Sequence, residues 1–256
     1  MNEENLINYY NKFNEDKRLT RRHGFVEFMT SMKYIHDFLS VGDKVLDIGA
    51  GTGRYSISLA NEGFDVTAVE LVKHNLRVIE SNSDKVKTFL GNAKDLSMLN
   101  DCYDVTLLFG PMYHLISKEE KILALNEAKR VTKKGGIIIV AYVMNDYAVI
   151  KHGFMENKIC ECISNGEISD DFHVTPKSTD LYSMVTLSDI DELNKEAGLS
   201  RIKIVSADGP SNYIRNFLNK MDDNTFDLFI KYHFSTCERM DLIGASAHTI
   251  DILKNN

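Results

Sequence analysis

The sequence predicts an α/β fold, a doubly wound sheet of seven mostly parallel strands with helices on both faces. Short apolar runs alternate with helical patterns from Val45 to Val143, as in consecutive strand–helix–strand units. A glycine-rich turn follows the first apolar run, and a carboxylate, Glu70, ends the second. The chain has 256 residues, of which 43% are hydrophobic. This is enough for one large domain with a substantial core.

The first strand–turn–helix unit carries most of the information. Residues 45–48 form a short apolar run suited to a strand buried on both faces. Glycines follow at three alternate positions, Gly49, Gly51 and Gly53. Apolar residues then recur at helical spacing until Gly63 ends the helix. The next strand, 66–69, closes on Glu70, where an acid accepts hydrogen bonds from ribose hydroxyls in nucleoside-binding units.

The spacing of the glycines distinguishes two kinds of nucleoside site. A dinucleotide fingerprint counted from Gly49 requires a third glycine at position 54, which is Arg54, so a nicotinamide enzyme is disfavoured. The pattern Asp47-x-Gly49-x-Gly51-x-Gly53 instead resembles the motif of class I S-adenosylmethionine (SAM) dependent methyltransferases. The alternative is a doubly wound fold whose glycine turn serves packing alone.

This resemblance implies a Rossmann-like methyltransferase fold that binds S-adenosyl-L-methionine and releases S-adenosyl-L-homocysteine. In the family, the acid matching Asp47 anchors the amino acid end of SAM, and the acid matching Glu70 holds both ribose hydroxyls. Asn92 and Ala93 match the positions that bind adenine, although Asn92 also suits an ordinary turn. The predicted SAM-binding residues are Asp47, Gly49, Ala50, Gly51, Gly53, Glu70, Leu71, Asn92, Ala93, Phe109, Tyr10 and Arg22.

The end of the fourth predicted strand, 103–109, indicates the type of acceptor. The following residues, Gly-Pro-Met-Tyr-His-Leu at 110–115, resemble a form found in ubiquinone-biosynthesis-like and related small-molecule methyltransferases. The motif of nucleic-acid amine methyltransferases differs, because Gly110 replaces its amine-binding residue and Met112 replaces its second proline. We therefore expect a small-molecule methyl acceptor, and methylation of adenine amines is disfavoured.

Two side chains of this segment are the candidate catalytic residues. His114 is the candidate general base, because an imidazole can take up a proton near neutral pH. Alternatively, His114 hydrogen-bonds the adenine-side loop or caps the following helix. Tyr113 is expected to pack against SAM or donate a hydrogen bond to it, since a phenol ordinarily ionises near pH 10.

Residues 1–42 are predicted to form a helical lid. Leu6, Tyr9, Tyr10 and Phe13 share one helical face, and a second amphipathic helix is expected from Thr20 to Leu39. Tyr9 or Tyr10 either covers the SAM pocket or belongs to the core. The basic segment 16–23 between the helices is either a solvated turn or a contact, through Arg18, Arg21 or Arg22, for an anionic substrate group.

Residues 43–256 are predicted to form the methyltransferase domain, with substrate-side insertions at 145–186 and 209–243. The expected helices and strands are helix 71–81, strand 86–90, helix 118–132, strand 137–143, helix 186–197, strand 199–207 and strand 247–253. Strand 247–253 should run antiparallel between its neighbours, as in the family. His233 with Glu238, and His248, are candidates to reach the pocket, although such residues more often serve structure.

Composition limits the remaining function classes. The formal charge of −7 argues against a broad nucleic-acid surface, because phosphate binding depends on Lys and Arg. No apolar run is long enough for a membrane span, and no export signal is visible, so we expect a cytoplasmic protein. Cys160 and Cys162 are spaced unlike zinc ligands, and no metal is expected. An RNA or protein methyltransferase and a non-catalytic SAM-binding module remain alternatives, and the oligomeric state is open.

Overall fold

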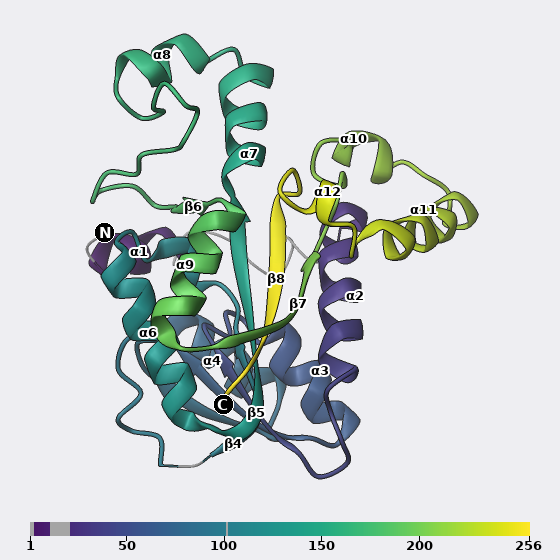
Figure 1. The fold of residues 1–256 in the computed structure, drawn as a ribbon. Helices are drawn as coiled ribbons and strands as arrows, with labels where there is room; N and C mark the ends of the chain where they lie inside the picture. The colour runs from purple at the N-terminus through teal and green to yellow at the C-terminus, as the bar shows by residue number, and fades with distance from the viewer. Residues whose placement is uncertain (1–2, 11–20, 101) are drawn as a thin grey trace.

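The computed structural model describes residues 3–10, 21–100 and 102–256. At its centre is a sheet with the strand order β3-β2-β1-β4-β5-β8-β7, and a short strand, β6, pairs with β5 (Figure 1). This confirms the predicted doubly wound fold. The strands are β1 (Lys44–Ile48), β2 (Asp65–Glu70), β3 (Val86–Leu90), β4 (Tyr103–Leu108), β5 (Thr132–Met144), β6 (Met184–Val185), β7 (Ser200–Ser206) and β8 (His248–Lys254).

Strand β8 determines which side chains reach the ligand edge of the sheet. It lies between β5 and β7 and is antiparallel to both, as the sequence predicts. Its first residue, His248, is therefore opposite Val143, near the end of β5. An antiparallel strand begins where its parallel neighbours end, so β8 delivers an imidazole to the edge at which ligands bind in this class of sheet.

Helices cover both faces of the sheet because the buried strands are apolar on both sides. In β5, Ile138 and Val140 belong to one core cluster, whereas Ile139 and Ala141 belong to the other. Helices α2 (Arg22–His36), α3 (Arg54–Glu62) and α4 (Lys73–Asn82) cover the second face. Helices α6 (Lys118–Val131) and α9 (Leu187–Ala197) cover the first (Figure 1).

A capping box explains where helix α9 begins, and strand β5 is longer than predicted. Helix α9 begins with a capping box in which Thr186 and Asp189 each bind the other's backbone N–H. Strand β5 starts at Thr132 rather than at residue 137, because Tyr103 of β4 pairs with Thr132 and Asn255 pairs with Gly135 and Gly136.

The N-terminal helices play two different parts. Helix α1 (Glu3–Tyr10) brings Leu6 and Tyr10 to the main cavity. Helix α2 buries Tyr34 and Ile35 in the core against the sheet, and it also brings Glu27 and Ser31 to the cavity. The predicted lid over residues 1–42 stays a prediction. The predicted roles of Phe13, Arg18 and Thr20 fall outside the described residues.

The first predicted insertion follows β5, and the second follows β7 and lies beside α2 (Figure 1). The first consists of α7 (Asn145–Ala148), a π-helix (Val149–Met155) and α8 (Ile159–Ser164). Within it, Ile168 and Val174 form an isolated bridge. The second insertion is helical, with α10 (Arg215–Leu218), α11 (Asp223–Thr236) and α12 (Met240–Ile243).

Helix α11 is fastened to α2 by a buried histidine. The ring of His233 is 1% exposed, and its Nε2 lies 2.9 Å from Oγ1 of Thr30. The Thr30 hydroxyl donates to the carbonyl oxygen of Val26, so Nε2 of His233 must donate to Thr30. Burial lowers the pKa of His233 to about 4.

We expect His233 to make stability fall with decreasing pH. The imidazole takes up a proton near pH 6.5 in the unfolded chain but only near pH 4 in the folded one. The free energy of unfolding therefore has its full value above pH 6.5 and decreases as the pH falls from 6.5 to 4. The loss is at most about 3 kcal/mol. In urea unfolding at pH 7.5 and pH 4.5, the stability difference between the wild type and His233→Gln should shrink at the lower pH. Glutamine keeps a donor for Thr30 but does not titrate, so an unchanged difference would contradict the assignment.

Candidate active site

The main cavity lies at the point where the sheet changes its winding direction. From β1 the chain continues to β2 and β3 on one side, and β4 and β5 lie on the other. The cavity between the turns that follow β1 and β4 has a volume of about 660 Å³. Such a switch point is where doubly wound folds bind nucleosides. Of the predicted site residues, those that line it are Tyr10, Asp47, Gly49, Ala50, Gly51, Glu70, Leu71, Asn92, Ala93, Phe109, Tyr113 and His114.

The turn after β1 requires glycine where it meets the turn after β4. Gly49 has a φ of +78°, a conformation that L side chains rarely adopt. A Cβ there would lie 2.5 Å from Cδ of Pro111 and 2.9 Å from the carbonyl oxygen of Phe109. Gly53 does not line the cavity. It precedes α3 with a φ of +89°, so its role in the structure is to start that helix.

Two buried carboxylates lie at the ends of β1 and β2. Asp47 is fully buried, and the hydroxyl of Ser56 donates to its Oδ2. Its Oδ1 is also buried and has no hydrogen-bond partner among the described residues. Burial raises the pKa of Asp47 to about 6. A buried acceptor without a partner is costly, so this oxygen suits the ammonium group of a bound ligand.

Glu70 is held in place by the glycine turn. Its Oε2 accepts from N–H of Gly51 at 2.8 Å, and its Oε1 accepts from N–H of Val72 at 2.8 Å. Burial raises the pKa of Glu70 to about 7 despite these hydrogen bonds. Each carboxylate oxygen can accept a further bond, so Glu70 can bind a pair of hydroxyls without losing its backbone contacts.

The turn after β3 carries the predicted adenine contacts. Oδ1 of Asn92 accepts from N–H of Lys94 at 2.9 Å, which fixes the side chain in a local turn. Asn92 and Ala93 both line the cavity. The turn and ligand-binding interpretations of Asn92 are therefore compatible. Lys94 pairs with Glu120 at 2.7 Å at the edge of the same region.

His114 joins two covers of the cavity. Its Nδ1 lies 2.8 Å from the carbonyl oxygen of Leu181, to which it donates. Its Nε2 therefore accepts the hydrogen bond from the Tyr10 hydroxyl, also at 2.8 Å. Burial lowers the pKa of His114, which favours the neutral ring. Both ring nitrogens thus have partners, one in the first insertion and one in α1.

We expect Tyr10→Phe to weaken SAM binding about 5-fold. The substitution removes the hydrogen bond that holds α1 to His114, a contact worth about 1 kcal/mol. Calorimetric titration with SAM measures the effect. Tyr9→Phe is the matched control, because the Tyr9 hydroxyl is 3.4 Å from that of Tyr182, near the limit for a hydrogen bond. Equal affinities of the wild type and Tyr10→Phe would show that α1 does not contribute.

Arg22 was expected at the cofactor, and the structure places it elsewhere. Its guanidinium pairs with Asp223 of α11 and lies 4.8 Å from the centre of the Phe226 ring. It does not line the cavity, because α11 supplies a carboxylate and an aromatic face. Glu238 is likewise away from the cavity and binds Tyr34 and Lys203.

Several cavity residues escaped the sequence analysis because distant segments supply them. Glu27 of α2 and Asn212, which follows β7, line the cavity, as does His248, which the sequence had offered as a candidate. Tyr147 and Tyr182 enter from the first insertion. No local motif marks these residues. The one available signal was the expected antiparallel direction of β8, which puts its first residue at the ligand edge.

A buried lysine holds the first insertion to the turn after β4. Lys121 is 4% exposed, and its Nζ donates to the carbonyl oxygen of Leu115 at 2.5 Å and to Oγ of Ser183 at 2.8 Å. Burial lowers its pKa to about 8. N–H of Ser183 donates to the carbonyl oxygen of Tyr113 at 2.7 Å. These contacts fix the position of Tyr113 and His114.

Comparisons with known proteins agree with this architecture. Residues 45–136 match the sequence model of a family described as a methyltransferase domain. The chain is 36% identical over 104 residues to a demethylmenaquinone methyltransferase of Paenarthrobacter aurescens, and the aligned segment covers 40% of each protein. The chain thus spans about 40% of the length of the curated relatives it matches.

Solved structures resemble the chain over most of its length. A SAM-dependent methyltransferase of Methanosarcina mazei has a TM-score of 0.59 at 16% identity, covering 86% of this chain and 96% of that one. Geranyl diphosphate C-methyltransferase of Streptomyces coelicolor, described in complex with S-adenosyl-L-homocysteine, has a TM-score of 0.55 at 13% identity, covering 89% and 79%. These similarities and the family match confirm the resemblance to class I SAM-dependent methyltransferases. Among the described helices, none has the length and apolar character that crossing a bilayer requires.

Proposed function

We propose that this chain transfers the methyl group of S-adenosyl-L-methionine to a small-molecule acceptor. The observation that carries the proposal is the pair of buried carboxylates, Asp47 and Glu70, on either side of the glycine turn. Asp47 offers a buried oxygen with no partner among the described residues, suited to an ammonium group. Glu70 offers acceptors suited to a ribose. The small-molecule relatives and the absence of an adenine-amine motif at 110–113 support the choice of acceptor.

In this proposal the protein supplies position and exclusion of water. Asp47 binds the amino acid end of SAM, Glu70 the ribose, and Asn92 with Ala93 the adenine. The bound sulfonium supplies the methyl group with a neutral leaving group. Reaction by in-line displacement then depends mainly on holding the acceptor on the line of attack, so the insertions that narrow the cavity contribute through geometry.

Binding and turnover experiments can distinguish this proposal from its rivals. Purified protein should bind SAM saturably in calorimetry, and absence of binding would refute the proposal. Affinity for acceptors that falls steeply with added salt would favour RNA. Arg22 gives that alternative little support, because Asp223 already pairs with it. SAM binding without release of S-adenosylhomocysteine from any acceptor would indicate a non-catalytic module.

A further inference from the structure

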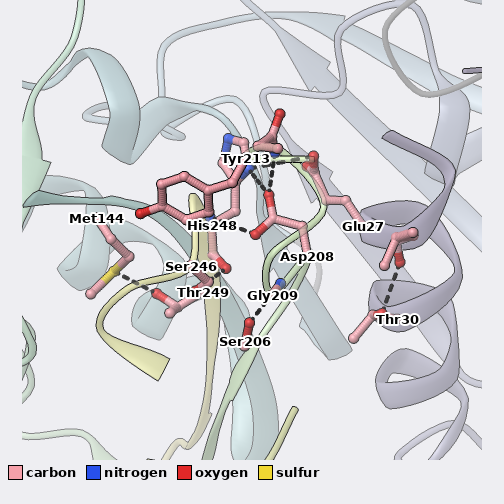
Figure 2. A network of polar contacts seen from close by, with 12 residues as sticks. Glu27, Thr30, Met144, Ser206, Asp208, Gly209, Tyr213, Ser246, His248 and Thr249 are labelled. Carbon is pink, nitrogen blue, oxygen red and sulfur yellow. Dashed lines mark hydrogen bonds and ion pairs between the residues drawn. The ribbon is translucent and has the colours of Figure 1, made fainter. Parts of the chain in front are cut away.

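Another histidine besides His114 lines the cavity at the start of β8, and a buried carboxylate lies beside it. His248 begins β8, and its Nδ1 lies 2.7 Å from Oδ2 of Asp208 and 3.6 Å from Oε2 of Glu27. Asp208 is fully buried and Glu27 is 5% exposed. Figure 2 shows the three side chains converging from β8, from the segment after β7 and from α2. His248 and Glu27 line the same cavity as the predicted cofactor residues.

The hydrogen bonds of Asp208 fix the orientation of the His248 ring. Oδ1 of Asp208 accepts from the backbone N–H of His248 at 3.1 Å. Its Oδ2 accepts from Nδ1 of His248 and from Nδ2 of Asn212, both at 2.7 Å. An ionised carboxylate only accepts, so Nδ1 carries the proton and Nε2 is the basic nitrogen of the neutral ring. This is the arrangement by which a carboxylate orients a histidine base.

His248 is better placed for proton uptake than His114. Nδ1 of His114 is backed by a neutral group, the carbonyl oxygen of Leu181. In His248 the carboxylate of Asp208 is in contact with Nδ1 and stabilises the ring when Nε2 gains a proton. The Tyr113 ring, whose centroid is 5.6 Å from that of His248, links this histidine to the turn after β4.

We propose that His248 is the general base of methyl transfer, that Asp208 positions it, and that the acceptor carries an ionisable proton on its nucleophilic atom. The acceptor is then a hydroxyl compound or a protonated amine. This inference rests on the proposed function. The acceptor's proton passes to Nε2 of His248, and its freed electron pair forms the bond to the methyl carbon. The carbon–sulfur bond breaks with its electrons left on sulfur, and the imidazolium later releases the proton to water.

The surroundings of the dyad favour this direction of proton transfer. Glu27 and Asp208 contribute two carboxylates beside one imidazole, so a proton on the ring reduces their mutual repulsion. Tyr113 lies against the His248 ring, and the charge of Asp208 reaches Tyr147 and Tyr213. These tyrosines carry no positive charge, and burial lowers the pKa of His233 to about 4. Arg215 acts on Tyr147, and Lys151 and His152, which also line the cavity, pair with Glu156.

The same three side chains also satisfy the spacing of a divalent-metal site, with ligand atoms within 4.8 Å of one another. The two possibilities exclude each other at one atom. A metal bound at Nδ1 displaces the proton there, whereas a base acting through Nε2 requires that proton. The protonation of Nδ1 is therefore the deciding observation.

The first test reads this protonation without an acceptor. In long-range ¹H–¹⁵N spectra of the full chain with S-adenosylhomocysteine at pH 7.5, His248 should be the Nδ1–H tautomer. Signals missing from His248→Gln identify it, and Asp208→Asn should shift them. An Nε2–H tautomer overturns the proposal, as does loss of the Nδ1 proton on adding Zn²⁺ or Mn²⁺ at micromolar concentration.

The second test measures release of S-adenosylhomocysteine over a panel of phenols, catechols and amines. His248→Gln should lower kcat at least 100-fold, in the range for loss of a general base, without changing SAM affinity. The acid limb of its pH–rate profile should disappear. His36→Gln is the control, since His36 pairs with Glu62 outside the cavity.

The outcomes of the two tests separate the two proposals. Three results would overturn the inference. His248→Gln could retain full activity, or the protein could methylate only acceptors without an ionisable proton. Alternatively, EDTA could abolish the activity and Mg²⁺ restore it. Each of these results leaves the SAM-binding proposal intact. Failure of the wild type to bind SAM would refute the proposed function itself. The tautomer decides the inference even if no compound in the panel is methylated.

Discussion

Glu70→Ala should lower SAM affinity at least about 100-fold. The variant loses the acceptors proposed for both ribose hydroxyls, and charge-assisted hydrogen bonds are worth about 1.5–3 kcal/mol each. It also frees the N–H groups of Gly51 and Val72, which the carboxylate now holds at 2.8 Å. Calorimetric titration with SAM at pH 8 measures the loss, and thermal unfolding confirms that the variant is folded.

The carboxyl group of Glu70 also makes SAM binding dependent on pH. Burial raises the pKa of Glu70 to about 7, so its carboxylate becomes protonated as the pH falls through that value and its capacity to accept decreases. SAM affinity should therefore weaken from pH 8 to pH 6. Glu192→Ala, which removes an exposed carboxylate near Lys118, is the control and should retain wild-type affinity. Unchanged binding by Glu70→Ala would refute the assignment of the ribose site.

Gly49→Ala should destabilise the protein by about 2–5 kcal/mol. A side chain at a positive φ costs about 1–2 kcal/mol, and overpacking adds about 1–3 kcal/mol. The new Cβ would be 2.5 Å from the ring of Pro111 and 2.9 Å from a backbone carbonyl, neither of which is a flexible side-chain end. For a domain of this size, the loss corresponds to a fall in Tm of about 4 °C or more.

Gly42→Ala separates the two causes of this loss. Gly42 has a φ of +89°, close to that of Gly49, but no atom lies within 4 Å of the position of its Cβ. Gly42→Ala should therefore lose only the stability that a side chain at positive φ costs, about 1–2 kcal/mol. Differential scanning calorimetry of both variants isolates the contribution of the contact between the turns after β1 and β4. Equal losses would mean that the two turns move apart freely.

The cofactor half of the site could be predicted from the sequence because its residues are close together along the chain. Asp47, the glycine turn and Glu70 occupy one strand–turn–helix–strand unit, and local propensity with apolar periodicity is enough to fold it in outline. The alternation of strands and helices also indicated a doubly wound sheet, whereas the order of its strands came from the structure. The placement of Asn92 and Phe109 at the cavity required only that parallel strands end at one edge of the sheet.

The acceptor half could not be predicted in the same way. Glu27, Asp208 and His248 come from three segments, and only the sheet topology brings them together. The direction of Arg22 depends on Asp223, about two hundred residues later in the chain. Amphipathic periodicity indicates that such residues lie on a helix, but it does not reveal which distant charge faces them.

The imidazole of His114 connects two segments that cover the cavity, α1 near the N-terminus and the loop at 181 in the first insertion. It holds α1 through Tyr10 and the loop at 181 through a carbonyl, so neither cover can swing away without breaking a contact of this ring. We therefore expect that opening one cover to admit a ligand also loosens the other. Replacing residues 145–186 with a foreign loop, to accept a new compound, should therefore also weaken the attachment of α1. The replacement would avoid this if it offers a carbonyl oxygen to Nδ1 of His114.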